Sequence, residues 1–190
     1  HITIDLSGVK KDADCFLNNK RQTIEEFKDL KAKGVSTIID VTNRGMGRST
    51  EYVSEVIKET GINILQATGY YKEPFLPEEV YKISEKEMAK LLVDEIVNWI
   101  DGTQVKAAVI GEIGTSLNKI EEMEKKVFEA SCRAHSETGA PIITHTTLGK
   151  LGLEQIEIFK EFNVDLSKVT LSHIDLSGDL EYMFRLVDTG

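Results

Sequence analysis

The chain has 190 residues, of which 41% are hydrophobic and 29% are charged, so it can bury a core and is not disordered by composition. Its formal charge of −9 argues against a general nucleic-acid or anionic-membrane binder, because such partners attract a basic surface. No apolar run approaches the roughly 18 residues that a membrane-spanning helix needs. Cys15 and Cys132 form no CxxC pair, which is typical of reduced thiols in a cytoplasmic protein.

Short apolar stretches alternate with segments of helical periodicity along the whole chain. Met88, Leu92 and Ile96 recur every four residues, as on the core face of an amphipathic helix, and Ser84 and Glu87 precede them as a capping box. In chain order, the predicted elements are a strand at 2–6, a helix at 22–33, a strand at 35–41, a helix at 49–60, a strand at 62–67, a helix at 84–100, a strand at 105–110, a helix at 119–137, a strand at 141–144, a helix at 150–163, a strand at 169–172 and a helix at 178–188.

This order favours an α/β fold with one parallel sheet, because strands that alternate with helices are joined by helical crossovers. No hairpin signal, low-complexity segment or linker interrupts the pattern, so residues 1–190 are predicted to form a single domain. The sequence begins at His1 without the features of a signal peptide. We expect it to start inside the first strand.

Ionisable side chains end three successive predicted strands. Glu112, His145 and His173 occupy these positions, and the carboxyl ends of parallel strands are where chemistry gathers in α/β folds. Imidazole and carboxylate together suit zinc or a similar divalent ion. A lone histidine at a strand end is more often a polar residue with ordinary partners, but three such groups together predict a metal site. His1 also lies on a strand, whereas His135 belongs to a helix end.

Other catalytic motifs are missing or weak. Gly111 and Gly114 form a GxG without the third glycine of a dinucleotide fingerprint, and there is no Walker loop or GxSxG elbow. Cys132 lies at a core position of a helix, which disfavours a pairing with His145 as nucleophile and base. A Schiff-base aldolase would need a lysine at a strand end, and none of the predicted strands ends in one.

A family resemblance runs from the first residue to the last. The chain resembles the phosphotriesterase family of the amidohydrolase superfamily, and most closely its bacterial phosphotriesterase homology branch. The stretches that carry the resemblance are HITIDLSG (1–8), DVTNRGMGR (40–48), ATGYY (67–71), GEIGTS (111–116), AHSETGAPIITHT (134–146), GLEQIEIFKEFNVDLSKV (152–169) and SHIDLSGDL (172–180).

The resemblance implies a TIM (β/α)8 barrel that holds two divalent metal ions, with Zn²⁺ the commonest and Mn²⁺ among the alternatives. His1 matches the second histidine of the family's HxH motif, and Glu112 matches the carboxylate that bridges the ions. His145 and His173 match the two histidines on the more exposed ion. Many members carry a carboxylated lysine in place of the glutamate, which also offers two oxygens.

Only strands 1–6 of such a barrel are represented, so the domain is expected to be truncated at both ends. The first histidine of HxH would precede His1, and the family's eighth-strand aspartate would lie beyond Gly190. A barrel of this type typically needs about 250 residues.

The implied activity is metal-dependent hydrolysis by a hydroxide held between the two ions. We favour a small-molecule lactone or carboxylic ester over a phosphoester as substrate, because natural phosphotriesters are rare. Glu112, His145 and His173 would act in catalysis as well as in metal binding. The alternative is a degenerate relative that binds metal without turnover. We expect no nucleic-acid or membrane partner, and a homodimer stays open.

Further side chains receive roles by their position near the strand ends. Asp175 is predicted to orient a ligand or accept a proton, or else to cap the following helix. Tyr71 resembles the aromatic position that lines the leaving-group pocket in the family, so it is predicted to line the substrate pocket or else to pack at the barrel rim. Arg44 is predicted to attract an anionic substrate. Asp40 and Arg48 are predicted to form an ion pair near the mouth of the barrel.

Overall fold

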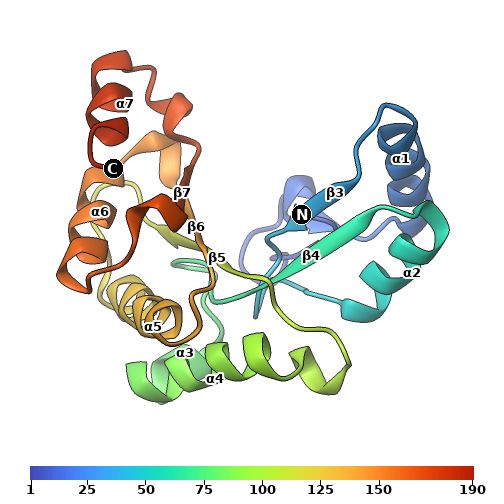
Figure 1. Cartoon of the computed structure of the whole chain (residues 1–190), viewed down its shortest axis with the longest axis horizontal. Coiled ribbons are helices and arrows are strands. Elements are labelled where there is room, and N and C mark those ends of the chain that lie inside the picture. Colours follow the sequence, from blue (N-terminus) through green and yellow to red (C-terminus); the bar gives the residue numbers. More distant parts are fainter.

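The computed structural model describes all 190 residues, and its centre is a curved sheet of five parallel strands. The strands pair in the order in which they occur in the chain, as expected for successive helical crossovers. Figure 1 shows them as an open arc whose outer side carries the helices, with the two edge strands, β3 and β7, well apart. The strands are β3 (Thr37–Asp40), β4 (Asn63–Thr68), β5 (Val109–Thr115), β6 (Ile142–Thr146) and β7 (Val169–Ser172).

The helices confirm the predicted alternation and differ from the prediction mainly at their ends. They are α1 (Lys20–Ala32), α2 (Thr50–Thr60), α3 (Glu78–Lys82), α4 (Glu85–Val97), α5 (Glu122–Thr138), α6 (Gly152–Glu161) and α7 (Leu180–Val187). The short helix α3 is an addition that the periodicity did not predict. None of the helices is both long enough and apolar enough to cross a bilayer.

Local signals in the sequence account for several helix boundaries. The capping box of Ser84 and Glu87 is present at the start of α4, where each residue satisfies a backbone N–H of the other. Gly61 and Gly139 follow α2 and α5 with φ of 65° and 71°, the left-handed conformation in which glycine lacks the strain of a side chain.

The apolar core divides between the two halves of the arc. The larger cluster lies between β5 and β6 and helices α4 to α6, and it includes Leu92, Phe128 and Phe159, all fully buried. A smaller cluster holds α2 against β4 and takes in Ile2 from the N-terminal segment. Burial of these side chains stabilises the fold by about 1.5–3 kcal/mol for each large residue.

The first predicted strand differs in the structure. Residues 2–6 do not join the parallel sheet. Instead β1 (Ile4–Asp5) pairs antiparallel with β2 (Phe16–Leu17) in a separate two-stranded sheet. The segment is held to the loop after β3 by single contacts, such as the hydrogen bond that Asp5 N–H donates to the Met46 carbonyl. The prediction of six strands in one sheet is therefore corrected to five.

Candidate metal centre

Three predicted ligands meet at one side of the sheet. Glu112 lies in β5, His145 lies in β6, and His173 follows the last residue of β7. Because these strands are neighbours, their side chains are brought close enough for one ligand atom from each to lie within 4.8 Å of the others. The cluster grades from a buried glutamate through a half-buried His145 to an exposed His173. Because exposure increases from Glu112 to His173, a small molecule can reach the cluster from the side of His173.

The Glu112 carboxylate faces histidines on both sides. Its Oε1 lies 3.1 Å from Nε2 of His1, while its Oε2 lies 3.6 Å from Nδ1 of His145 and 3.8 Å from Nε2 of His173. One carboxylate thus has one histidine at one oxygen and two at the other. These N and O donors are the ones that zinc and similar divalent ions prefer, so the residues present fit a divalent-metal site.

Gly111 explains how Glu112 reaches this position. The pairing of β5 with β6 shifts register between Ile110 and Ile113, as in a β-bulge, which re-aims side chains. Gly111 sits in this irregularity with φ of +135°, and a Cβ there would lie 2.1 Å from the Ile143 carbonyl oxygen. No residue other than glycine fits. The structure also extends β5 to Thr115, so Glu112 lies within the strand rather than at its end.

Buried amides hold the backbone of two ligands. Asn43 Nδ2 donates to the Glu112 carbonyl at 2.8 Å, and Gln155 Nε2 donates to the His145 carbonyl at 3.0 Å. Both amide side chains are fully buried. Both residues lie in stretches that carry the family resemblance, but no pattern in the sequence assigned either of them this role.

Tyr71 lies against His145, which supports its predicted place beside the site. Its hydroxyl is 3.3 Å from the His145 ring nitrogens, and the two rings meet edge to face at 5.1 Å. Burial, followed by the negative charge of Glu112, raises the pKa of Tyr71 well above that of an ordinary tyrosine. The phenol therefore stays protonated at neutral pH and can donate a hydrogen bond.

The predicted ion pair between Asp40 and Arg48 is wrong. Arg48 instead contacts Glu95 of α4 at 2.7 Å and Asp101 at 2.9 Å. Asp40 is buried and accepts hydrogen bonds from the backbone N–H of Ile2 and from Thr42. Because α4 packs against the loop after β3, its buried Glu95 lies beside Arg48. The residues next to Arg48 in the sequence give no sign of this pairing.

Arg44 joins the same ion-pair network. Its guanidinium contacts Glu95 and Glu79 and also donates to the Tyr70 hydroxyl at 3.0 Å. Burial by itself would lower the pKa of Arg44, but the charges around it raise the pKa instead. None of its contacts is with a predicted metal ligand, so its role in substrate binding stays a prediction.

Asp175 lies in a short turn after β7, and His135 lies in the last turn of α5. Asp175 lies in the 3₁₀ turn Ile174–Ser177 with an exposed side chain, and the residue that caps α7 is Asp179, not Asp175. The capping alternative for Asp175 is therefore wrong. His135 is buried at the end of α5, where Nδ1 lies 2.8 Å from the Ala140 carbonyl. That contact fits the structural role predicted for it.

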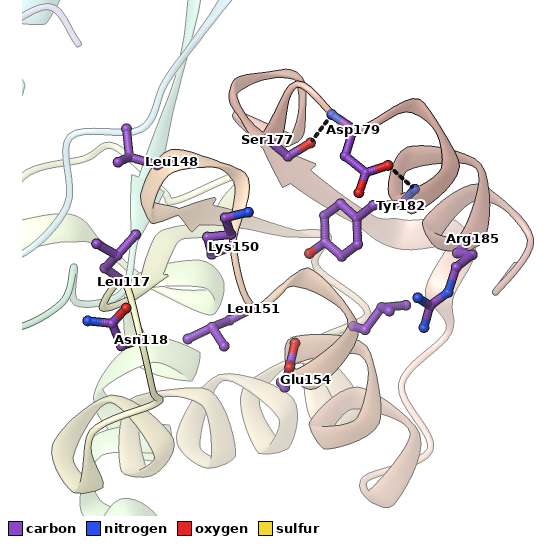
Figure 2. A pocket seen from close by; sticks show the side chains of 11 residues that line it. Leu117, Asn118, Leu148, Lys150, Leu151, Glu154, Ser177, Asp179, Tyr182 and Arg185 are labelled. Atoms are coloured by element: carbon purple, nitrogen blue, oxygen red, sulfur yellow. Dashed lines mark hydrogen bonds between the residues drawn. The ribbon is translucent and has the colours of Figure 1, made fainter.

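A cavity of about 720 Å³ is lined by none of the predicted metal ligands. Figure 2 shows that its walls come from the segments after β5 and β6 and from helices α6 and α7, with Tyr182, Lys150 and Arg185 around the space. Inside it, Asp179 accepts from the Tyr182 N–H at 3.0 Å.

Comparison with known proteins decides the family. The family model described as "Phosphotriesterase family" matches residues 1–190. This chain belongs to the phosphotriesterase family. It is 46% identical to the phosphotriesterase homology protein of Escherichia coli over all its residues, which cover 65% of that protein. It is 34% identical to an N-acetyltaurine hydrolase of Danio rerio, a match over 85% of this chain and 46% of the relative.

Solved structures of similar proteins superpose closely on the arc. The crystal structure of the Escherichia coli protein, with phosphate in its active site, matches 99% of this chain with a TM-score of 0.96 and 65% of its own chain. A lactonase of Listeria monocytogenes matches with a TM-score of 0.93 at 30% identity, over all of this chain and 64% of its own. The chain therefore spans about two thirds of these relatives and about half of the Danio rerio hydrolase. Its five strands correspond to part of the family's barrel.

Proposed function

We propose that this chain carries most of the active site of a divalent-metal-dependent hydrolase with two metal ions. The observation that supports this most directly is the Glu112 carboxylate, which has His1 at one oxygen and His145 with His173 at the other. We take Zn²⁺ as the first candidate and Mn²⁺ as the next, because imidazole and carboxylate suit borderline divalent ions.

Different side chains of the chain would bind the two ions. His1 and one oxygen of Glu112 would hold one ion, and His145, His173 and the other oxygen would hold the second. When bound, such ions act as Lewis acids toward a carbonyl or phosphoryl oxygen and activate water at neutral pH. Glu112 is buried, so its two oxygens stay in place and are not drawn into solvent.

Tyr71 and Asp175 are the proposed residues for handling substrate. The protonated Tyr71 hydroxyl beside His145 can donate to a substrate oxygen and orient it. Asp175 follows His173 by two residues, and its exposed carboxylate can accept the proton released in hydrolysis. Arg44 would contribute only at longer range, because its guanidinium is already paired with Glu79 and Glu95.

We propose a small lactone or carboxylic ester as the substrate class. The Listeria monocytogenes relative, similar over the whole of this chain, is described as a lactonase. The Danio rerio relative is described as an N-acetyltaurine hydrolase, so an N-acyl amide belongs in the same test.

The experiment combines metal analysis with a substrate panel on the purified protein that contains this chain. About two ions per molecule, with hydrolysis of a lactone or ester, are expected. Glu112→Gln should lose metal and reduce kcat/KM by more than about 100-fold. His135→Gln, which alters the remaining histidine, is the matched control and should keep both.

The other outcomes have equally definite meanings. One ion per molecule would reduce the proposal to a centre of Glu112, His145 and His173. Two ions without hydrolysis of any lactone, ester, amide or phosphoester would favour the non-catalytic alternative. A folded protein without metal would contradict the proposal.

A further inference from the structure

The side chain of Lys72 lies over the face of β5 that carries Glu112. Gly114 comes two residues after Glu112, so both positions face the same side of the strand, while Ile113 between them is buried in the core on the other side. A Cβ added at Gly114 would lie 3.2 Å from Cδ of Lys72 and 3.2 Å from Cβ of His145. The stem of Lys72 therefore fills the space that a side chain at position 114 would take, next to His145.

Hydrogen bonds on both sides of Lys72 fix its backbone beside β5. The carbonyl of Tyr71 accepts from Gly114 N–H at 3.0 Å. On the other side, Glu73 N–H donates to the buried carboxylate of Glu124 at 3.2 Å. Lys72 is thus held in place by β5 on one side and by the first turn of α5 on the other.

The ammonium of Lys72 forms no ion pair. Nζ donates to the Glu73 carbonyl at 3.0 Å, whereas the Glu73 carboxylate accepts from the Tyr81 hydroxyl at 2.7 Å. An ammonium has three N–H donors, so two of them remain for a ligand. Burial lowers the pKa of Lys72 from its usual value, although the charges of Glu124 and Glu112 oppose this effect. The amine has therefore lost part of its hydration, which a bound anion would replace.

One aromatic ring connects this ammonium to the metal cluster. Nζ lies 5.6 Å from the ring centre of Tyr71 and 5.6 Å from that of Phe75, and these two rings stack on each other. The Tyr71 ring also meets the His145 ring edge to face. A small molecule bound at His145 reaches the ammonium of Lys72 by extending along Tyr71 over several bonds.

We propose that Lys72 is a substrate-binding residue that recognises a carboxylate or a similar small anionic group, several bonds away from the bond that is hydrolysed. Arg44 does not take this role, because its guanidinium is paired with Glu79 and Glu95. The inference rests on the proposed function for the reaction, whereas anion binding by Lys72 stands on the geometry around its ammonium.

The first test uses two pairs of esters in which a carboxylate is exchanged for a carboxamide. One pair carries the group on the leaving side, as 4-carboxyphenyl and 4-carbamoylphenyl acetate, and the other on the acyl side, as the monophenyl esters of glutaric and glutaramic acid. Lys72→Met keeps the stem over Gly114 and removes the charge. In at least one pair it should lower kcat/KM for the carboxylate ester by about 10–100-fold and leave the carboxamide ester unchanged.

Two further variants control for effects other than charge at this position. Lys72→Arg keeps the charge and should retain most of the activity toward the carboxylate ester. Lys126 of α5 is also half-buried and donates to a backbone carbonyl, that of Val80. Lys126→Met should therefore leave both esters of each pair unchanged. If Lys72→Met does not fold, Lys72→Gln replaces it with the same expectation.

The second readout is the binding of glutarate by calorimetry, with glutaramide as the neutral match, to zinc-loaded and to metal-free protein. Lys72→Met should weaken glutarate binding by about 10–100-fold in both forms, and Lys126→Met should not change it. A carboxylate that binds a metal ion directly would not depend on Lys72.

The two readouts separate this inference from the hydrolase proposal. Glutarate binding that depends on Lys72, in a protein that hydrolyses none of the esters, would support the anion site and contradict the hydrolase. Hydrolysis in which Lys72→Met affects charged and neutral esters equally, with unchanged glutarate binding, would overturn the role of Lys72 and leave the hydrolase proposal intact.

Discussion

Two residues with positive φ place the ligands of the centre. Gly111 has φ of +135° immediately before Glu112, and His173 itself has φ of +64°. Such backbone conformations cost about 1–2 kcal/mol for a residue with a side chain, and they persist where surrounding structure enforces them. At His173 the left-handed backbone follows the end of β7 and places the imidazole ring beside the Glu112 carboxylate. Local backbone geometry, not only strand order, therefore positions the site.

Gly111→Ala should destabilise the protein and disturb the centre. The added Cβ would lie 2.1 Å from the Ile143 carbonyl oxygen, so β5 or β6 must shift. We expect a loss of about 3 kcal/mol in the free energy of unfolding, from overpacking and the positive φ together. Urea denaturation measures this loss. Gly8→Ala is the control, because a Cβ added at Gly8 would have no atom within 4 Å. An equal loss of stability in Gly8→Ala would contradict the explanation.

At the scale of elements, α4 is tied to the loop after β3 by buried charges. Glu95 of α4 is 4% exposed and is contacted by Arg48, Arg44 and the Thr68 hydroxyl. Burial alone would raise the pKa of Glu95, but the hydrogen bond and charge of Arg48 outweigh it and hold the pKa below the usual 4.5. This network connects a helix of the outer layer to the segment that carries Thr42 and Asn43.

Glu95→Gln should cost about 3 kcal/mol of stability at neutral pH, because it leaves two arginines without their buried partner. Since the folded pKa is lower than the unfolded one, this contribution is present above pH 4.5 and is lost as the pH falls from 4.5 through the folded pKa. The gap between the parent and Glu95→Gln should therefore narrow below pH 4.5. Unfolding curves at pH 7 and pH 4 measure it.

The control for this prediction is Glu26→Gln, since Glu26 is exposed on α1 and belongs to no ion pair. Its stability should follow the parent at both pH values, within about 0.5 kcal/mol. A constant gap for Glu95→Gln across the pH range would contradict the ionic explanation and point to packing alone.

At the scale of the whole molecule, the centre joins parts of the chain that lie far apart. His1 comes from the N-terminal segment outside the parallel sheet, while Glu112 and His145 lie in β5 and β6 and His173 directly follows β7 (Figure 1 shows these elements). Within this chain, β3 and β7 each have a free edge, and α7 exposes Leu180, Phe184 and Val187. A metal ion bound by His1 and by the ligands of β5 and β6 would link these distant parts of the chain and stabilise the folded state.

Zinc should therefore raise the melting temperature. A ligand that binds only the folded state at 100 times its Kd adds about 2.7 kcal/mol, which corresponds to roughly 5–10 °C for a chain of this size. Calorimetry with zinc and with EDTA measures the shift. Glu112→Gln should abolish it, and His135→Gln should retain it. A zinc effect that survives in Glu112→Gln would place the bound metal elsewhere.

Most of the helices and the order of the parallel strands could be predicted, because buried apolar residues recur at regular spacing within each element. The spacing of Met88, Leu92 and Ile96 was enough to predict α4. The end of β5 was missed, since Gly111 and Gly114 are typical of a turn but here belong to an irregular strand. The segment at residues 2–6 was misplaced because its strand pairing depends on β2, which carries no hairpin signal.

The sequence by itself determined the alternating α/β order, the family and the residue types at the centre, because periodicity and short motifs are written in neighbouring residues. Only the tertiary structure decided that Arg48 pairs with Glu95, that Glu112 has histidines at both oxygens, and that Thr42 faces Nδ1 of His1. Those contacts join residues 33 or more positions apart in the chain. Their distances are set by how helices and strands pack, which no local pattern records.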